Sequence, residues 1–160
     1  MANYILICVD TVDGDGRVEP AFKTLSVRLA ASYWPLYKRT ANSRHIAVGD
    51  RVIVYAGGQR AWGMSFHATA TVKGKTASNR TIDRKLSGLE GQRLPDQWLE
   101  LSDVRRLDPC VPIAELLSEL SFIPKNQQRW GVAIMSGSRR ISDFDWELIL
   151  GYRPRHLPLA

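Results

Sequence analysis

The sequence predicts a small β-barrel of the α+β class, with helices packed around it. The first observation is an apolar run at residues 51–56, rich in Val and Ile, which begins after a Gly49-Asp50 turn and ends at Gly57-Gly58, as buried strands do. The second is the alternation of apolar and polar residues at 66–72, typical of a strand with one face in a core. The third is helical periodicity before and after this hairpin, which predicts helices that cover the barrel.

The composition is that of one globular domain spanning residues 1–160. Hydrophobic residues make up 44% and charged residues 24% of the chain, and 160 residues suffice for a core without disulfides. No apolar run approaches the roughly 18 residues of a membrane-spanning helix, and the first residues do not resemble a signal peptide, so we expect a cytoplasmic protein. Cys8 and Cys110 have neither the number nor the spacing of a disulfide framework or metal site, and we expect two reduced, partly buried thiols.

The charge of the chain favours a nucleic-acid partner. Lys and Arg total 22 against 16 Asp and Glu, giving a net charge of +6, and most of the cations are arginine. The planar guanidinium pairs with phosphate through two hydrogen bonds and stacks on bases. The three histidines are scattered, and no phosphate-binding loop, nucleophile elbow or spaced metal-ligand set is present, so we expect neither an enzyme nor a cofactor.

The amino-terminal part is predicted to form a central strand followed by a helix. The apolar run at residues 4–9 indicates the strand, with the polar pair Asp10 and Thr11 at its carboxyl end. Residues 13–16 form a flexible turn, since the calcium-loop pattern that they begin is not completed. From Pro20 a helix begins and ends before Trp34-Pro35, with three apolar residues on one face: Phe22, Leu25 and Leu29.

Aromatic residues then gather where this helix ends. Tyr33, Trp34 and Tyr37 precede basic and amide side chains, among them Arg39, which is the composition of a base-stacking cluster. The other interpretation is that Trp34 and Tyr37 seal the helix against the barrel.

Two connections of the barrel carry more cations than a turn needs. The hairpin connection at residues 57–64 contains Arg60 and Trp62. The polar segment from Lys73 to Arg93 has little periodicity, and it is either a phosphate-binding segment, through Arg80, Arg84 and Lys85, or a solvated flap.

The carboxyl-terminal part is predicted to contain two strands and two helices. A strand pattern returns at residues 98–104, and Val111-Pro112 opens a short helix whose apolar face is Ile113, Leu116, Leu117 and Leu120. An apolar strand is expected at 132–135. Ser142 and Asp145 are a capping pair for a last helix that turns three residues to the core: Phe144, Leu148 and Ile149. Residues 152–160 are Pro-rich and should form an extended tail.

Four stretches, in this order, resemble the EVE family of the PUA-like superfamily, which also includes the YTH readers of methylated adenine. They are ILICVDT near the amino terminus, Trp34 with the later VGDRVIVYAGG, then LSFIPKNQQRWG, and finally ISDFDWELI. The sister group of ASCH domains has a GxKxxExR signature, which this chain lacks. The similarity is best to the short standalone EVE proteins and covers most of the chain.

The resemblance implies a PUA-like twisted, mostly antiparallel β-barrel flanked by helices, with an aromatic cage for a flipped-out and often modified base. Carried over by position, the resemblance implies a base pocket of Trp34, Asp10, Thr11, Asn126 and Trp130. From the residues themselves we add Tyr37, and Trp62 as a lid. The expected phosphate-binding residues are Arg39, Arg60, Arg80, Arg84, Lys85 and Lys125.

The function predicted first is a non-catalytic reader of a modified base, such as a methylated or hydroxymethylated one, in DNA or RNA. The family's bacterial members frequently serve modification-dependent restriction or defence systems, so such a system is the expected setting. The alternative is an RNA-binding module in RNA metabolism without modification dependence. An enzyme with a hidden acid-base pair ranks third, and a structural or small-molecule-binding protein last.

Overall fold

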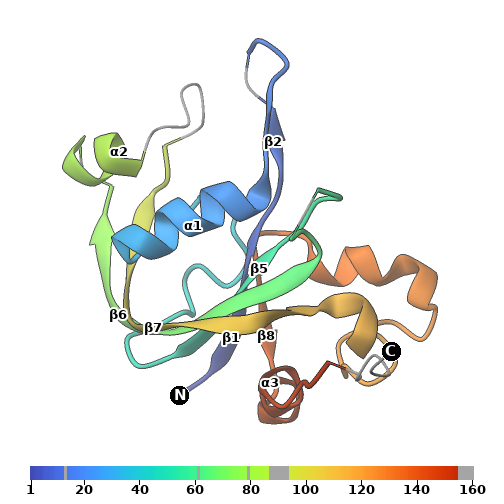
Figure 1. Ribbon diagram of the computed structural model, residues 1–160. Helices are drawn as coiled ribbons and strands as arrows, with labels where there is room; N and C mark the ends of the chain where they lie inside the picture. The colour runs from blue at the N-terminus through green and yellow to red at the C-terminus, as the bar shows by residue number, and fades with distance from the viewer. Residues whose placement is uncertain (13, 61, 79, 87–93, 155–160) are drawn as a thin grey trace.

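A six-stranded sheet curls into a half-barrel in the computed structural model, which describes residues 1–12, 14–60, 62–78, 80–86 and 94–154 (Figure 1). Across the sheet the strands are β4 (Tyr33–Leu36), β7 (Gln97–Pro112), β6 (Ser65–Ala77), β5 (Arg51–Ala56), β1 (Asn3–Cys8) and β8 (Ser138–Ile141). β1 and β5 are parallel, and the other neighbouring strands are antiparallel. The predicted α+β class, the central strand and the hairpin are therefore confirmed.

Helix α1 (Ala21–Ala31) lies in the crossover between the parallel strands and packs on the sheet (Figure 1). It begins after Pro20, as predicted, and ends at Ser32, whose φ of 60° is the left-handed conformation of a helix terminus. Two short strands, β2 (Thr11–Val12) and β3 (Val18–Glu19), pair with each other just before the helix. This arrangement places the start of α1 beside the carboxyl end of β1.

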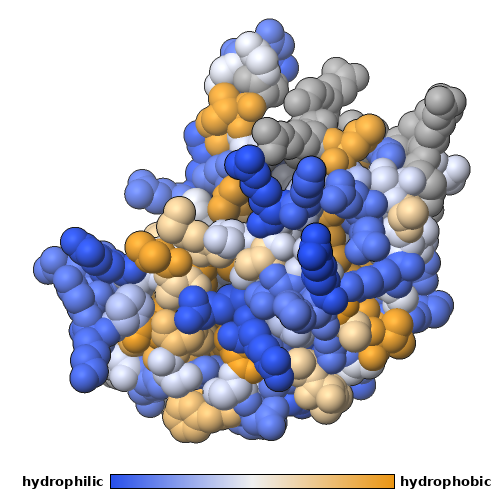
Figure 2. Space-filling view, turned by 180° about the vertical axis from the view of Figure 1, so that it is seen from behind, coloured by the Kyte–Doolittle hydropathy of each residue, from blue (hydrophilic) through white to orange (hydrophobic). Residues whose placement is uncertain are grey.

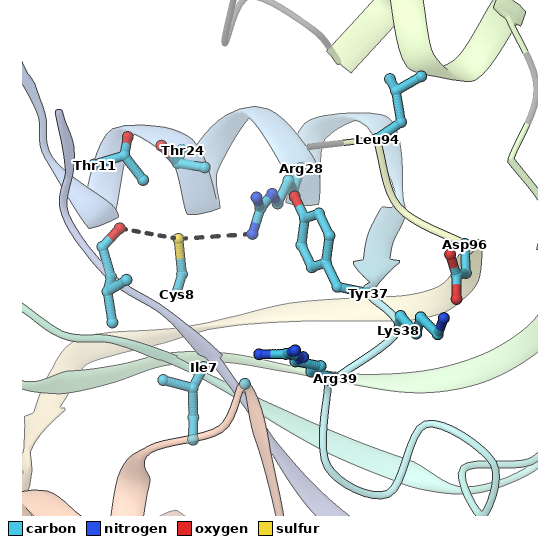
Figure 3. A pocket seen from close by; sticks show the side chains of 12 residues that line it. Ile7, Cys8, Thr11, Thr24, Arg28, Tyr37, Lys38, Arg39, Leu94 and Asp96 are labelled. Carbon is cyan, nitrogen blue, oxygen red and sulfur yellow. Dashed lines mark hydrogen bonds between the residues drawn. The ribbon is translucent and has the colours of Figure 1, made fainter. Parts of the chain in front are cut away.

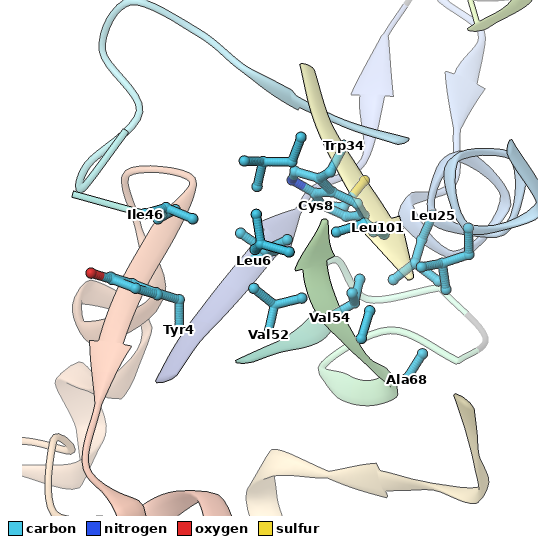
Figure 4. Close-up of a cluster of buried hydrophobic side chains, with 14 of the residues drawn as sticks. Tyr4, Leu6, Cys8, Leu25, Trp34, Ile46, Val52, Val54, Ala68 and Leu101 are labelled. Atoms are coloured by element: carbon cyan, nitrogen blue, oxygen red, sulfur yellow. The ribbon is translucent and has the colours of Figure 1, made fainter. Parts of the chain in front are cut away.

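The sheet is buried on both faces, which explains the continuous apolar run of β5. Val52, Val54 and Ala56 belong to one hydrophobic core, which Leu25 and Leu29 of α1 cover (Figure 4). Ile53 and Tyr55 belong to a second core on the other face. That second core is covered by the 3-10 helices η1 (Ile113–Leu116) and η2 (Gln127–Ile134) and by α3 (Asp143–Leu150).

The sequence pattern assigns Phe66 to the wrong face of the hairpin. The alternation places Phe66 with Ala68 and Ala70, yet Phe66 packs in the second core and the alanines in the first. The pairing of β6 with both neighbours shifts between Phe66 and Ala68, so the strand has a bulge there. A bulge adds one residue on one strand, and the side chains beyond it change faces.

The chain between β6 and β7 is more regular than its sequence suggests. β6 continues to Ala77, so the connection expected from Lys73 begins as strand, and α2 (Arg80–Leu86) follows. Residues 87–93 of that predicted connection lie outside the described residues. The missed strand β4 contains Pro35, which an edge strand accepts because its outer side needs no backbone donor.

Two expectations near the carboxyl terminus are wrong. Residues 132–135 are not a strand, because the 3-10 helix η2 runs through Ile134 and the last strand is β8. Phe144 does not face the core, since 62% of it is exposed, whereas Ile149 is fully buried. The predicted cap is confirmed, because the Asp145 amide donates to Ser142 Oγ at 3.1 Å. The expected tail from Tyr152 is described only to residue 154.

Both cysteines are free in the described chain; Cys110 is half-buried, but Cys8 is buried rather than partly buried as expected, because β1 lies inside the sheet. Within the described ranges, no helix combines the length and the apolar composition needed to cross a membrane.

Candidate functional site

A cavity of about 770 Å³ opens at the carboxyl end of β1, between α1 and the segment that follows β4 (Figure 3). Residues from five parts of the chain line it: Ile7, Cys8, Val9, Thr11, Thr24, Arg28, Tyr37, Lys38, Arg39, Leu94, Asp96 and Gly137. Its size falls within the roughly 300–1,000 Å³ typical of pockets for small organic ligands.

The helix side of the cavity carries a buried cation. Arg28 is 9% exposed, and its guanidinium carbon lies 5.0 Å from the centre of the Trp34 ring. Its Nη1 donates to Cys8 Sγ at 3.7 Å, and Figure 3 shows the side chain pointing from α1 toward Cys8 and Tyr37. Stacking on an indole and a hydrogen bond to sulfur hold the guanidinium in one orientation.

The Cys8 side chain stays a neutral thiol beneath this cation. Burial raises the pKa of Cys8 most strongly; Arg28 lowers it and Asp10 raises it further. The thiol donates to the Ala21 carbonyl at 3.6 Å while its sulfur accepts from Arg28. Cys8 therefore gives the cavity a weakly polar floor without adding negative charge.

The opposite wall is a turn that the fold holds in place. The Tyr37 amide donates to Thr40 Oγ1 and the Thr40 amide to the Tyr37 carbonyl, both at 3.0 Å. Gly137 packs against this turn with a φ of 79°, and a Cβ there would lie 3.2 Å from Thr40 Cγ2. Its carbonyl also accepts from the Ile7 amide at 2.9 Å, which ties the turn to β1. The wall is thus pre-organised around the Tyr37 ring.

Asp10 holds three elements together at the edge of the site. Its Oδ1 accepts from the Ala21 amide at 2.8 Å, which satisfies a free donor at the start of α1. A side chain at Gly58 would collide with the Asp10 carboxylate, so the β5–β6 connection also rests against it. Asp10 does not line the cavity.

Of the residues predicted for the site, the structure brings Thr11, Tyr37 and Arg39 together in the cavity wall. Trp34 is 2% exposed, belongs to the first core and contacts the site through Arg28 (Figure 4). Trp62 does not line the cavity. It is 61% exposed on the β5–β6 connection, with its ring centre 6.3 Å from that of Phe22.

Two other predicted residues, at the start of η2 and within it, do not line the cavity. Asn126 Oδ1 accepts from the Gln128 amide at 3.2 Å and so caps that helix, while Trp130 packs against the second core. Lys125 and Arg60 are exposed. The side chains of the remaining predicted phosphate contacts, Arg80, Arg84 and Lys85, lie outside the described part of the chain.

Sequence reasoning missed the contribution of α1. Thr24 and Arg28 are four residues apart and therefore share a helix face. Arg28 also lies three residues after Leu25 and directly before Leu29, so it borders the predicted apolar face. A cation at the border of a buried stripe is the signal that could have identified it. The cavity residues from the segment before β7, Leu94 and Asp96, gave no such signal.

The surface away from α1 is mostly hydrophilic. In Figure 2, which shows the molecule from behind, hydrophilic side chains gather over the middle and apolar ones are scattered between them. This agrees with a chain in which 24% of the residues are charged.

The chain is a domain of PUA-like fold with a ligand-sized cavity beside its first strand, and known structures share this fold. Human THYN1, solved in complex with DNA containing 5-methylcytosine, matches with a TM-score of 0.60 and 11% identity over 98% of this chain and 100% of that one. The N-terminal domain of McrB from Staphylothermus marinus matches with a TM-score of 0.59 and 11% identity over 93% of each chain. A hypothetical protein from Leishmania major matches with a TM-score of 0.57 and 15% identity over 94% and 93%.

No protein-family model matches the sequence, and no curated protein matches it either. At identities of 11–15% the structural likeness establishes the fold. It confirms the PUA-like architecture and, in fold, the resemblance to the EVE domains.

Proposed function

We propose that this protein is a non-catalytic nucleic-acid-binding domain that accepts a flipped-out, modified base in the cavity beside β1. The observation that carries the proposal is the cavity itself, whose polar and aromatic walls include the cations Arg28, Lys38 and Arg39 in a chain of net charge +6. The human THYN1 complex, with 5-methylcytosine in its DNA, supports DNA and modified cytosine as the first candidates.

The wall residues fit an extruded base. A flipped base loses stacking worth a few kcal/mol, and an aromatic face returns about 1–3 kcal/mol. Tyr37 supplies such a face, and Thr11 and Thr24 supply hydroxyl groups that can hydrogen-bond a base edge. Lys38 and Arg39 lie at the same wall and can contact the flanking phosphates, which fix position without reading sequence.

Discrimination of a methyl group depends on a closely fitted wall. One methyl or methylene in an apolar pocket decides only about 1–3 kcal/mol, or roughly 5- to 150-fold in affinity. The turn around Tyr37 is held by hydrogen bonds to the side-chain hydroxyl and the amide of Thr40, so it can provide such a fit without first ordering itself.

A binding panel tests the proposal. Fluorescence anisotropy with single- and double-stranded DNA and RNA, each with cytosine, 5-methylcytosine or 5-hydroxymethylcytosine at one position, should show preference for a modified base. Tyr37→Ala should reduce that preference by the loss of roughly 1–3 kcal/mol of stacking. Phe144→Ala, which removes an exposed ring on α3, is the matched control and should bind like the wild type.

The same panel distinguishes the proposed reader of a modified base from the alternative, an RNA-binding module without modification dependence. Equal affinity for modified and unmodified strands, with RNA bound more tightly than DNA, would refute base reading and favour an RNA-binding module. Unchanged base preference in Tyr37→Ala would remove the cavity from the proposal.

A further inference from the structure

The strongest unexplained feature of the cavity is a buried guanidinium that lacks a counter-ion. The ion pairs found among the described residues involve Lys23, Arg51 and Arg105, not Arg28. Arg28 has five N–H donors, and its contacts within the described chain are Cys8 Sγ and the Trp34 ring. An arginine 9% exposed and without a carboxylate is costly, because a buried charge loses its hydration.

Cys8 does not supply the missing negative charge. Burial raises the pKa of its thiol, and the thiol can donate to the Ala21 carbonyl at 3.6 Å or to the Val9 carbonyl at 4.0 Å. A neutral thiol is a weak acceptor and cannot balance a cation.

A second polar group on the same helix face also lacks a partner. Thr24 is 3% exposed, lines the cavity one turn before Arg28, and its Oγ1 has no hydrogen bond. Buried hydroxyl groups are nearly always hydrogen-bonded, so this unpartnered hydroxyl beside Arg28 is a second polar group of the helix face that the described residues leave unsatisfied. The other charged residues that line the cavity are Lys38, Arg39 and Asp96, so cations outnumber carboxylates in the described lining.

We infer that the cavity binds an anionic oxygen group of a nucleotide, which accepts hydrogen bonds from Arg28 and Thr24. That the ligand is a nucleotide rests on the proposed function. That its contacting group is an anionic oxygen rests on the two unpaired groups, Arg28 and Thr24. A guanidinium pairs with a carboxylate or a phosphate through two parallel N–H···O bonds. Two sources provide this chemistry: a carboxylate on the base, and a phosphate at the 5′ end of a strand.

The experiment measures affinity for matched oligonucleotides at one salt concentration. One comparison replaces a single internal cytosine by 5-carboxylcytosine, and the other replaces a 5′-hydroxyl by a 5′-phosphate. A third comparison, 5-methylcytosine against cytosine, tests the proposed function separately. We expect one of the first two changes to tighten binding by roughly 10- to 100-fold, the range of a charge-assisted hydrogen-bond pair.

Variants of the cavity residues test whether this gain in affinity arises in the cavity. Arg28→Met should abolish it, and Arg28→Lys should keep part of it, since lysine retains the charge but not the planar fork. The matched control is Arg140→Met. Arg140 is exposed and lies opposite Tyr4 in the β1–β8 pairing, near the other end of β1, so its removal should leave the gain in affinity unchanged. If Arg28→Met fails to fold in a thermal melt, Thr24→Val, which keeps the side-chain shape, should still reduce the gain.

The outcomes distinguish failure of the anion site from failure of the proposed function. A preference for 5-methylcytosine without any gain from a carboxylate or a phosphate overturns the anion site and leaves the proposed function standing. A gain that persists in both Arg28→Met and Thr24→Val likewise overturns it. A gain from the 5′-phosphate that Arg28→Met abolishes supports the anion site even where the methyl group has no effect.

Discussion

Replacing Trp34 by alanine should destabilise the protein rather than merely weaken ligand binding. Trp34 is 2% exposed and packs in the first core with Cys8, Leu101 and Leu25 nearby (Figure 4). A buried Trp removes about 150–250 Å² from water, worth roughly 4–6 kcal/mol at about 25 cal/mol per Å². Area sums of this kind are upper bounds, so we expect about 3–5 kcal/mol, in line with other Trp-to-Ala changes in cores.

The substitution also removes the ring on which Arg28 lies. That contact is worth about 0.5–2 kcal/mol, and without it the guanidinium is held only by Cys8. For a domain with a total stability of about 5–15 kcal/mol, the combined loss is large. At about 2–4 °C per kcal/mol for a domain of this size, it corresponds to a fall in the melting temperature of roughly 7–28 °C.

A thermal melt run beside the binding titration tests this. Trp62→Ala is the control, because that ring is 61% exposed and its removal should change stability by about 0.5 kcal/mol or less. If Trp34→Ala melts within about 2 °C of the wild type, the burial argument is refuted. If it melts normally and loses preference for the modified base, Trp34 forms the pocket wall, as the resemblance to EVE domains implies.

Three further predictions concern charge, pH and the edge of the site. Binding of oligonucleotides should weaken steeply with salt in a titration series, with a slope near 0.9 per phosphate neutralised on duplex DNA and about 0.7 on single strands. Burial lowers the pKa of His67, so its neutral form stabilises the fold, and the melting temperature should fall as the pH drops below 6.5. His67→Gln should lessen this fall. In urea denaturation, Asp10→Ala should cost about 0.5–2 kcal/mol through loss of the cap on Ala21, and Asp10→Asn, which keeps an acceptor, should cost less.

Each of these has a clear contrary result. A flat salt response would count against nucleic acid as the partner. An identical pH dependence in His67→Gln and the wild type would mean that other groups govern acid stability. A changed base preference in a fully stable Asp10→Asn would show that the carboxylate reads the ligand rather than capping α1.

The sequence by itself determined the elements whose signals are local. The run at residues 51–56, the alternation at 68–72, the capping of the last helix by Ser142 and the start of α1 after Pro20 all depend on neighbouring residues, and all are confirmed. The ordered motifs of the EVE resemblance predicted the PUA-like fold, which the structure shares with known proteins. The sequence selected Thr11, Tyr37 and Arg39 because they follow a strand end or stand among aromatics, and the structure places all three in the wall of one cavity.

Only the tertiary structure decided which side chains share the cavity. Cys8, Arg28 and Gly137 are far apart in the chain and meet because α1 crosses β1 and because the segment before β8 packs on the Tyr37 turn. The same applies to Trp34, since its pattern fits both a pocket wall and a core, and only packing against both α1 and the sheet buries it. Burial and long-range pairing are sums over distant contacts, and a local pattern of residue types does not contain them.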